Sequence, residues 1–422
     1  MKLLLLLAAA VAVFTPAAQA DLQELAAVLP PCALDCMVKY IPESHCAPTD
    51  QVCICTDPDL TNKLRLCIET SCTVRESLTA QNITETACGA PVRDRTKAVS
   101  VTGVAGGVVA FIFFCLRMIS RLPCFGGQFG MDDWTMVLTM ALLIPFTALS
   151  VVLADHGLGL DIWRVPFDNI TKILYIYWID ESIYVSILPL TKISICYFYL
   201  RIFPKKSFCI ATYVLIALNV AYIIVFVTVS VFQCRPIRAA WLRWDGSYAD
   251  AYCNSENKQA WASAAINMIL DIMTMSLPLM ELSKLTLKTK KKVFVMLMFS
   301  VGFFVTIVSI VRLSSLVQFA NTANVTWDYV PVGYWSTIEC DVGVICACLP
   351  SVRSLLVQLF PSVFSGSTNQ GTNMKASTSR STPAASRLET SRFQKNKDDS
   401  DFIPLVDMDN GSQVHLARPE PV

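Results

Sequence analysis

Charged residues are scarce in this 422-residue sequence: they make up 16% of it, whereas hydrophobic residues make up 54%. A soluble domain carries about 25% charged residues, so this composition argues against an ordinary soluble protein and indicates one that meets lipid. The net charge is only +1, which argues against nucleic acid as a partner. Histidine is also rare, and the sequence has no nucleophile–base set, phosphate-binding loop or HExxH motif. We therefore do not expect an enzyme.

Cysteine is distributed unevenly along the chain. Eight of the 17 cysteines fall between Cys32 and Cys88, and the other nine are scattered over everything that follows. The first twenty residues are typical of a secretory signal, because Lys2 precedes an apolar run too short to span a membrane and Ala18-Gln19-Ala20 is a small-x-small cleavage site. We expect residues 1–20 to be removed and the cysteine-rich segment to lie in an oxidising, extracellular compartment.

Residues 21–91 form the first expected domain, and its cysteines imply a disulfide framework, since so short a segment cannot bury enough apolar surface alone. Spacing favours two of the bridges. Cys32 and Cys36 lie one helical turn apart, and Cys67 and Cys72 are also closely spaced, so two antiparallel helices would be joined by Cys32–Cys72 and Cys36–Cys67. Cys53 and Cys55 flank a single residue and are expected to have different partners. The remaining pairings stay open.

The cysteine-rich segment also carries a recognisable motif. It reads Leu29-Pro30-Pro31-Cys32-Ala33-Leu34-Asp35-Cys36, then Cys46, then Thr49-Asp50-Gln51-Val52-Cys53-Ile54-Cys55. Over residues 24–90 this pattern closely resembles the fungal CFEM domain, a compact helical fold. The resemblance implies four disulfides, namely Cys32–Cys72, Cys36–Cys67, Cys46–Cys53 and Cys55–Cys88.

The resemblance to the CFEM domain also implies a cofactor, haem. Some CFEM domains bind haem with an aspartate as the axial iron ligand, and the matching residue here is Asp50. A carboxylate is a hard oxygen ligand, so a bound haem would be ferric. The alternative is that Asp50 caps a turn or a helix, as aspartate commonly does. His45 lies nearby and is a competing candidate.

From residue 98 onward, long apolar runs alternate with short polar segments. Seven runs are long enough to cross a bilayer as helices. The expected spans are 98–118, 133–154, 172–200, 209–232, 260–282, 293–318 and 335–358. The predicted fold class is a small disulfide-rich all-α extracellular domain followed by an all-α seven-transmembrane helix bundle over residues 98–360. Residues 361–422 are rich in serine and threonine, cannot form a core, and are expected to be a disordered cytoplasmic tail.

Two patterns predict the same orientation. The loops after spans 1, 3 and 5 carry roughly twice as many basic residues as the opposite loops, which makes them cytoplasmic by the positive-inside rule. The sequons at Asn82, Asn169 and Asn324 all fall on the expected outer side. Cys234 and Cys253 share one outer loop and can close it as a disulfide.

Ionisable residues inside the expected spans form a second candidate site. Span 3 holds Asp180 and Glu181, span 6 holds Arg312, and span 7 holds Glu339 and Asp341; all are expected at a similar depth near the outer surface, with Asp271 deeper. A charge that faces lipid is costly, so these side chains should point to one another or to a water-filled cavity. They form either a structural ion pair around Arg312 or the floor of a ligand pocket.

The membrane segment carries a second set of motifs. They are Arg117-Met118-Ile119-Ser120-Arg121, Asp132-Asp133-Trp134, His156-Gly157-Leu158-Gly159, Lys192-Ile193-Ser194, Tyr199-Leu200-Arg201-Ile202-Phe203-Pro204, Cys234-Arg235-Pro236 and Leu277-Pro278. Over residues 98–360 they resemble the fungal rhodopsin-like domain of pathogenicity-associated seven-helix receptors. The resemblance implies a G-protein-coupled-type receptor that senses host surfaces.

The functional hypothesis is a plasma-membrane receptor whose extracellular domain meets an unidentified ligand or surface and whose helices pass the change inward to a heterotrimeric G protein. One alternative is a haem-binding or adhesive surface protein that uses the helices as an anchor. A transporter is the third class, because intramembrane charges also line translocation paths; inverted repeats would favour it, and the sequence shows none.

Overall fold

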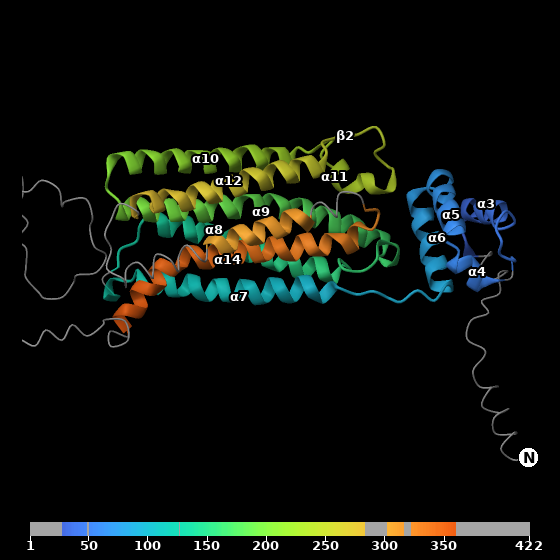
Figure 1. Cartoon of the computed structure of the whole chain (residues 1–422), viewed down its shortest axis with the longest axis horizontal. Coiled ribbons are helices and arrows are strands. Elements are labelled where there is room, and N and C mark those ends of the chain that lie inside the picture. The colour runs from blue at the N-terminus through green and yellow to red at the C-terminus, as the bar shows by residue number, and fades with distance from the viewer. Residues whose placement is uncertain (1–27, 49, 126, 283–301, 316–321, 360–422) are drawn as a thin grey trace, which may run out of the picture.

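The structure is a computed structural model that describes residues 28–48, 50–125, 127–282, 302–315 and 322–359. The expected signal peptide at 1–20, the tail at 361–422 and parts of the expected span 293–318 lie outside these residues. Two helical units follow one another along the long axis: a small cysteine-rich domain and a long bundle, joined by a short extended linker (Figure 1). We call the end of the bundle nearer the small domain proximal and the other end distal.

The cysteine-rich domain consists of four short helices whose starts are set by local sequence. They are α3 (Pro31–Tyr40), α4 (Gln51–Thr56), α5 (Pro58–Ser71) and α6 (Val74–Ala87). Proline occupies the first turn of α3 and α5, where its missing N–H costs nothing. Asp57 caps α5, and Thr73 with Glu76 forms a capping box on α6.

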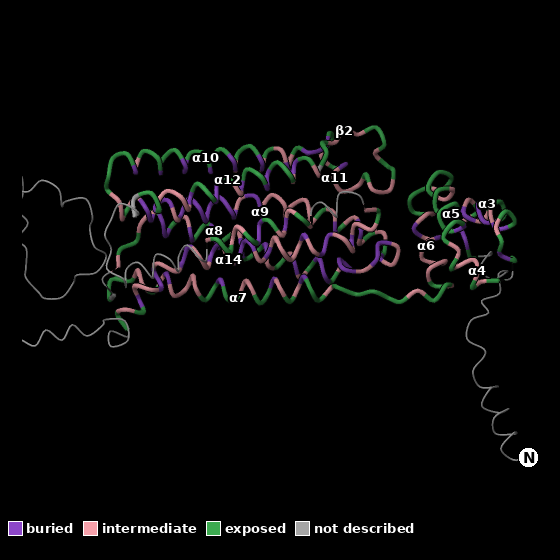
Figure 2. The backbone as a smooth tube through the Cα atoms, viewed as in Figure 1, coloured by how far each residue is buried: buried purple, intermediate pink, exposed green. Residues whose placement is uncertain are grey.

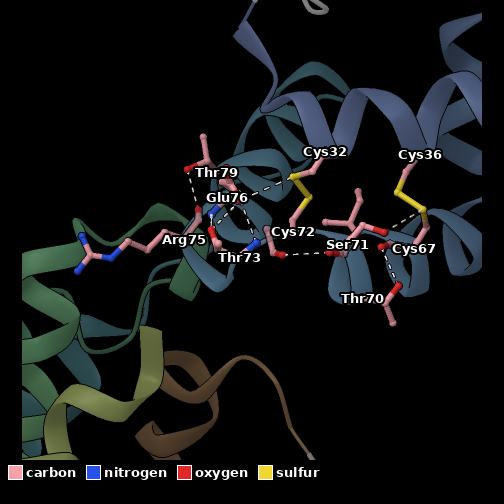
Figure 3. The surroundings of a disulfide bond; sticks show 12 residues. Cys32, Cys36, Cys67, Thr70, Ser71, Cys72, Thr73, Arg75, Glu76 and Thr79 are labelled. Atoms are coloured by element: carbon pink, nitrogen blue, oxygen red, sulfur yellow. Dashed lines mark hydrogen bonds between the residues drawn. A yellow bond between two sulfur atoms is a disulfide. The ribbon is translucent and has the colours of Figure 1, made fainter. Parts of the chain in front are cut away.

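Four disulfides hold this domain together. The bridges Cys32–Cys72 and Cys36–Cys67 join α3 to the end of α5, as the spacing predicts (Figure 3). Because the residue order reverses between the two helices, α3 and α5 run antiparallel. Cys46–Cys53 and Cys55–Cys88 complete the set, and these are also the pairs that the CFEM resemblance implies. Between the bridges lies a small apolar core that includes Ala33, Leu60 and Ala80.

The bundle contains, among the described residues, six helices that are long and apolar enough to cross a membrane. They are α7 (Thr96–Ser120), α8 (Met131–Asp155), α9 (Phe167–Ile202), α10 (Lys206–Val231), α12 (Glu256–Leu282) and α14 (Val325–Leu359). A shorter apolar helix, Gly302–Ser315, lies within the expected sixth span. The other six expected spans agree with the six long helices except at the ends. The expected span 7 begins at 335, whereas α14 begins at Val325; its first turn packs against the proximal loops, where Thr326 donates to the carbonyl of Leu160.

Burial separates the helices into inner and outer ones. In the most apolar stretch of α9, 67% of the residues are buried, whereas the corresponding share in α7 is 17%. The main core is made of inward faces of α8, α9, α10 and α14, and outward faces remain exposed along the bundle (Figure 2). Exposed apolar side chains are what lipid requires, so this inverted pattern fits a membrane protein.

The long loop between α10 and α12 folds over the proximal end. It contains the paired strands β1 (Cys234–Arg235) and β2 (Tyr252–Cys253), the helix α11 (Ala239–Leu242) and a 3₁₀ turn at Arg243–Asp245. Cys234 and Cys253 lie opposite each other in the strand pair and form the fifth disulfide. This is the pair expected from the sequence.

Candidate functional site

The centre of the bundle holds a buried ion pair. Arg312 Nε lies 3.0 Å from Glu339 Oε2, and the side chain of Glu339 is completely buried. Tyr184 donates a hydrogen bond to Glu339 Oε2 at 2.7 Å, while Ser309 and Asn267 donate to Oε1. The guanidinium of Arg312 also lies over the Tyr184 ring, 4.9 Å from its centroid. Both oxygens of the carboxylate therefore have partners, which is the condition for keeping it charged in a dry interior.

A second buried pair is joined to the first. Lys192 Nζ lies 3.1 Å from Asp271 Oδ1 and donates to Asn267 Oδ1 at 2.6 Å. Asn267 in turn donates to both Asp271 and Glu339. We refer to Tyr184, Lys192, Asn267, Asp271, Ser309, Arg312 and Glu339 as the buried polar network. It links α9, α12, the helix Gly302–Ser315 and α14.

The remaining acids of the expected cluster do not join this network. Glu181 accepts a hydrogen bond from Gln259 at 3.2 Å, and Gln259 also reaches Ser230. Asp180 Oδ1 and both oxygens of Asp341 have no hydrogen-bond partner among the described residues. The layer of five groups expected from depth alone is therefore divided. Glu339 and Asp341 lie two residues apart, about 200° around the helix, so they face opposite sides of α14.

Sequence reasoning missed four members of the network, Lys192, Asn267, Tyr184 and Ser309. Lys192 appeared only as part of a motif, although a lysine within an apolar span is itself a strong sign of a buried partner. Asn267, Tyr184 and Ser309 carry no comparable signal, because polar neutral residues are common in membrane helices.

A second cluster of charges closes the distal end. Arg117 is only 1% exposed and contacts two carboxylates, Asp133 through Nε and Asp132 through Nη2, each at 2.9 Å. Arg121 contacts the same two aspartates, at 3.2 and 2.8 Å. Arg201 lies farther away, 4.0 Å from Asp132, and is 40% exposed. We call these five residues the distal ion cluster.

The distal ion cluster ties four helices together. Arg117 of α7 donates from Nη1 to the carbonyl of Ala347 on α14 at 2.7 Å. Ser194 of α9 donates to the carbonyl of Asp132 at 2.6 Å, where α8 begins. Arg117 and Arg121 are two of the basic residues at the cytoplasmic end expected for span 1; both form ion pairs, and Arg117 is buried. The motifs that contain these charges, RMISR and DDW, therefore meet in space.

The cysteine-rich domain is docked on the proximal loops through α6. Arg75 leaves α6 toward the bundle (Figure 3) and lies 2.8 Å from Asp245. Its guanidinium sits over the rings of Phe167 and Trp244, 5.6 and 5.5 Å from their centroids. Hydrogen bonds from Ser247, with Arg75 adding to them, hold the pKa of Asp245 below its ordinary value. Leu78 of α6 belongs to the same apolar cluster as the proximal ends of the bundle helices.

The linker between the two units is also fixed to the bundle. Arg93 pairs with the buried carboxylate of Asp161, which accepts a further hydrogen bond from Asn324 at 2.8 Å. Arg93 and Arg95 both lie over the Trp327 ring, 4.5 and 4.3 Å from its centroid, at the start of α14. Movement of the cysteine-rich domain would thus reach α14 and the loop before α9 directly.

Gly159 makes this joint possible. Its φ is +109°, and a Cβ there would lie 2.5 Å from the backbone nitrogen of Thr96. Its N–H donates to the carbonyl of Thr326, and its own carbonyl accepts from Arg95 N at 2.9 Å. Only glycine combines this backbone conformation with such close contact.

Asp50 lies at the start of α4. It is exposed, and Oδ1 accepts a hydrogen bond from Cys53 N at 3.0 Å, so Asp50 is the N-cap of that helix. Oδ2 has no hydrogen-bond partner among the described residues and remains open to a ligand. His45 is also exposed. A hard, exposed carboxylate oxygen fits ferric iron, so the residue suits the ligand role while it also caps the helix.

The three sequon asparagines occupy different surroundings. Asn82 on α6 and Asn169 on α9 are half-buried. Asn324 uses Nδ2, the atom that would carry a glycan, to donate to Asp161. Its side-chain oxygen accepts from Ile162 N. Asn324 thus has a structural role at the joint.

Comparison with known families agrees with this two-part architecture. Residues 116–358 match the family model described as Fungal rhodopsin domain, which covers more than half of the chain. The chain belongs to the fungal rhodopsin domain family. Residues 25–89 of this fungal rhodopsin-domain protein match the CFEM domain model.

Several curated fungal proteins are similar to this fungal rhodopsin-domain chain. A SAT4 family membrane protein of Emericella nidulans is 24% identical over 60% of this chain and 64% of its own length. Fugralins biosynthesis cluster protein 2 of Gibberella zeae is 27% identical, over 46% of this chain and 49% of its own. Receptor GIN3 of Arthrobotrys oligospora is 23% identical, over 59% and 60%. The chain thus covers less than two thirds of these relatives. No solved structure matches it.

Proposed function

We propose that this protein is a receptor of G-protein-coupled type, in which the CFEM domain binds an extracellular ligand or surface and the bundle passes a change of packing to the opposite side. The observation that carries this proposal is the docking of the CFEM domain. Through Arg75 and the linker at Arg93–Arg95 it contacts the loops before α9 and α12 and the start of α14. A ligand that displaced the domain would alter the support of three helices at once.

The cysteines support the orientation proposed here. The ten cysteines in disulfides lie in the CFEM domain and the proximal loop. The free cysteines among the described residues all lie in the bundle helices or in the distal turn that contains Cys124. Because disulfides persist in oxidising compartments, the proximal end should be extracellular and the distal end cytoplasmic. The name of the similar Receptor GIN3 is in keeping with a sensing role.

The distal ion cluster supports a conformational role for the bundle. It joins α7, α8, α9 and α14 at the end where a cytoplasmic partner would bind. Since α14 carries both the proximal Trp327 contact and the distal Ala347 contact, a shift of this helix couples the two ends. A packed interface of this kind has discrete arrangements, which is what a switching receptor needs.

The first test of this proposal uses Arg75→Gln to loosen the CFEM domain without a ligand. Arg75 is 51% exposed, so we expect a loss of about 1 kcal/mol or less in docking free energy from its ion pair and ring contacts. Amide hydrogen exchange in nanodiscs should then speed up several-fold at residues 159–166, and more weakly at the distal residues 116–134.

Arg65→Gln is the matched control for this experiment, because Arg65 is an exposed arginine of the same domain whose ion pair is with Glu69 on its own helix. It should leave exchange in both bundle segments unchanged. If Arg75→Gln alters the proximal segment and never the distal one, the helices act as an anchor, and the receptor proposal fails.

Haem binding is a second candidate function, favoured by the open Oδ2 of Asp50. Because Asp50 is also the N-cap of α4, the variant that tests haem binding must preserve the cap. Asp50→Ala would lose both the cap, at about 0.5–2 kcal/mol, and the ligand, whereas Asp50→Asn keeps a good N-cap and removes only the carboxylate.

We therefore predict that Asp50→Asn abolishes the ferric haem absorption spectrum of the purified protein with little change in thermal stability. Reduction of the iron should weaken binding to the unaltered protein, because a carboxylate favours ferric over ferrous iron. His45→Ala is the control and should retain the spectrum. A spectrum that survives Asp50→Asn but disappears in His45→Ala would remove Asp50 from this role.

A further inference from the structure

Asp341 is a buried acid of the bundle that the polar network does not neutralise. It lies on α14, is 2% exposed, and neither carboxylate oxygen has a hydrogen-bond partner among the described residues. A buried carboxylate without hydrogen bonds or a counter-charge is too costly to persist in the ionised form. The carboxylate must therefore be neutralised in the folded protein, either by a proton or by a bound cation.

The surroundings of Asp341 are unusually close. Its carboxylate lies directly against Gly106 of α7, where an added Cβ would overlap Oδ2. Gly103 and Gly107, on the same face of α7, likewise leave room for polar side chains of α8, because a Cβ at Gly107 would lie 2.8 Å from Thr147 Oγ1. Within two turns of α7, the three glycines thus let the carboxylate of α14 and two side chains of α8 approach the α7 backbone.

The hydroxyl groups beside these glycines present oxygen lone pairs. A Cβ at Gly103 would overlap Ser150 Oγ, which is buried and donates its own hydrogen to the carbonyl of Thr147 at 2.8 Å. The buried Thr337 of α14 donates its hydrogen to the carbonyl of Gly333 at 2.9 Å. With their hydrogens already used, these hydroxyls can only accept. One carboxylate and several hydroxyl oxygens make a hard ligand set.

We propose that Asp341, with Thr147 and Ser150 as neutral oxygen ligands, forms a binding site for a small monovalent cation of the sodium class between α7, α8 and α14. The charge of the ion follows from the site. A single carboxylate is balanced by one positive charge, whereas a divalent ion would leave an excess charge inside the membrane. Gly106, which the carboxylate contacts, lies about 15 Å along α7 from its proximal end, at 1.5 Å per residue.

The site would hold α7 against α14, because the ion shields the carboxylate that faces the α7 backbone. It does not depend on whether the protein is a receptor, since it concerns only the packing of three helices. Binding to the folded state alone raises thermal stability in proportion to the logarithm of ion concentration above the dissociation constant.

The test measures the melting temperature Tm of the purified full chain in detergent while sodium chloride replaces N-methyl-D-glucamine chloride at constant ionic strength. We expect Tm to rise by several degrees with sodium and by less with potassium. Asp341→Asn should remove the sodium response and, in the absence of sodium, be at least as stable as the unaltered protein, because it removes an unpaired buried charge. Ser150→Ala should shift the response to higher sodium concentrations.

Asp180→Asn is the matched control, since it removes another acid with a buried, unpartnered oxygen from a different helix, α9. It should keep the full sodium response. The proposal is overturned if Tm ignores sodium in the unaltered protein, if Asp341→Asn still responds, or if the response is lost in Asp180→Asn instead. A Tm that ignores sodium but rises as pH falls would identify a protonated carboxyl and likewise exclude the cation site.

Discussion

Replacing Arg117 with methionine lowers the free energy of unfolding by about 3–5 kcal/mol, the usual cost of leaving buried charges without their partner. Arg117 is 1% exposed and contacts two carboxylates that are 3% and 0% exposed. Its loss leaves Asp132 and Asp133 with Arg121 and the more distant Arg201, and frees the carbonyl of Ala347. Thermal unfolding in detergent, together with the yield of correctly inserted protein, measures the effect.

Arg201→Gln is the control, because it removes the same charge from the same cluster at an exposed position. Arg201 is 40% exposed and its nearest carboxylate oxygen is 4.0 Å away, so we expect a change of about 1 kcal/mol or less. Arg117→Lys should fall between the two variants, since an ammonium cannot hold two carboxylates and a carbonyl in a planar fork. Equal effects of Arg117→Met and Arg201→Gln would show that the distal cluster contributes only surface electrostatics.

The distal ion cluster also shows where sequence reasoning stopped. Arg117 and Asp132 stand in separate motifs on opposite sides of a short loop, and their proximity follows from the hairpin of α7 and α8. The sequence predicts the depth and the sign of these charges, which places them at the membrane boundary. The sequence does not predict how α7 is rotated about its own axis, and this rotation turns Arg117 inward to the backbone of α14.

The same limit explains the mixed outcome for the central charges. Depth was enough to bring Arg312 and Glu339 to one layer, and the structure pairs them at 3.0 Å. Depth was not enough for Asp341, because two residues along a helix reverse the face. By contrast, the spans and the two disulfides that join α3 to α5 depend on periodicity and local spacing, which a sequence records directly. The contact between Arg75 and Asp245 depends on how the CFEM domain meets the helix bundle. No local sequence pattern records such a contact.

The paired variants Arg312→Met and Glu339→Gln decide what the central ion pair contributes. Each single substitution strands one buried charge, so each should lower the free energy of unfolding by about 3–5 kcal/mol. In the double variant no charge is stranded, and the single side-chain oxygen of the glutamine still accepts a hydrogen bond from one of the two hydroxyl donors, Tyr184 or Ser309. We therefore expect the double variant to recover most of the loss, with a coupling energy of about 2 kcal/mol or more in a double-mutant cycle.

The exposed pair Arg65–Glu69 supplies the reference cycle. Its atoms are 3.9 Å apart and its side chains are 62% and 49% exposed, so its coupling should stay near 0.3–0.5 kcal/mol, roughly the value for such helix pairs. A central coupling no larger than this would mean that the Arg312–Glu339 contact does not hold the bundle together. If the double variant is stable, Arg75→Gln can be added to it and amide hydrogen exchange measured at the distal residues. This experiment separates a purely structural role of the ion pair from a role in transmitting the change. A preserved distal response means that the pair only fixes helix packing, whereas a lost response means that the network carries the change from the CFEM domain across the membrane.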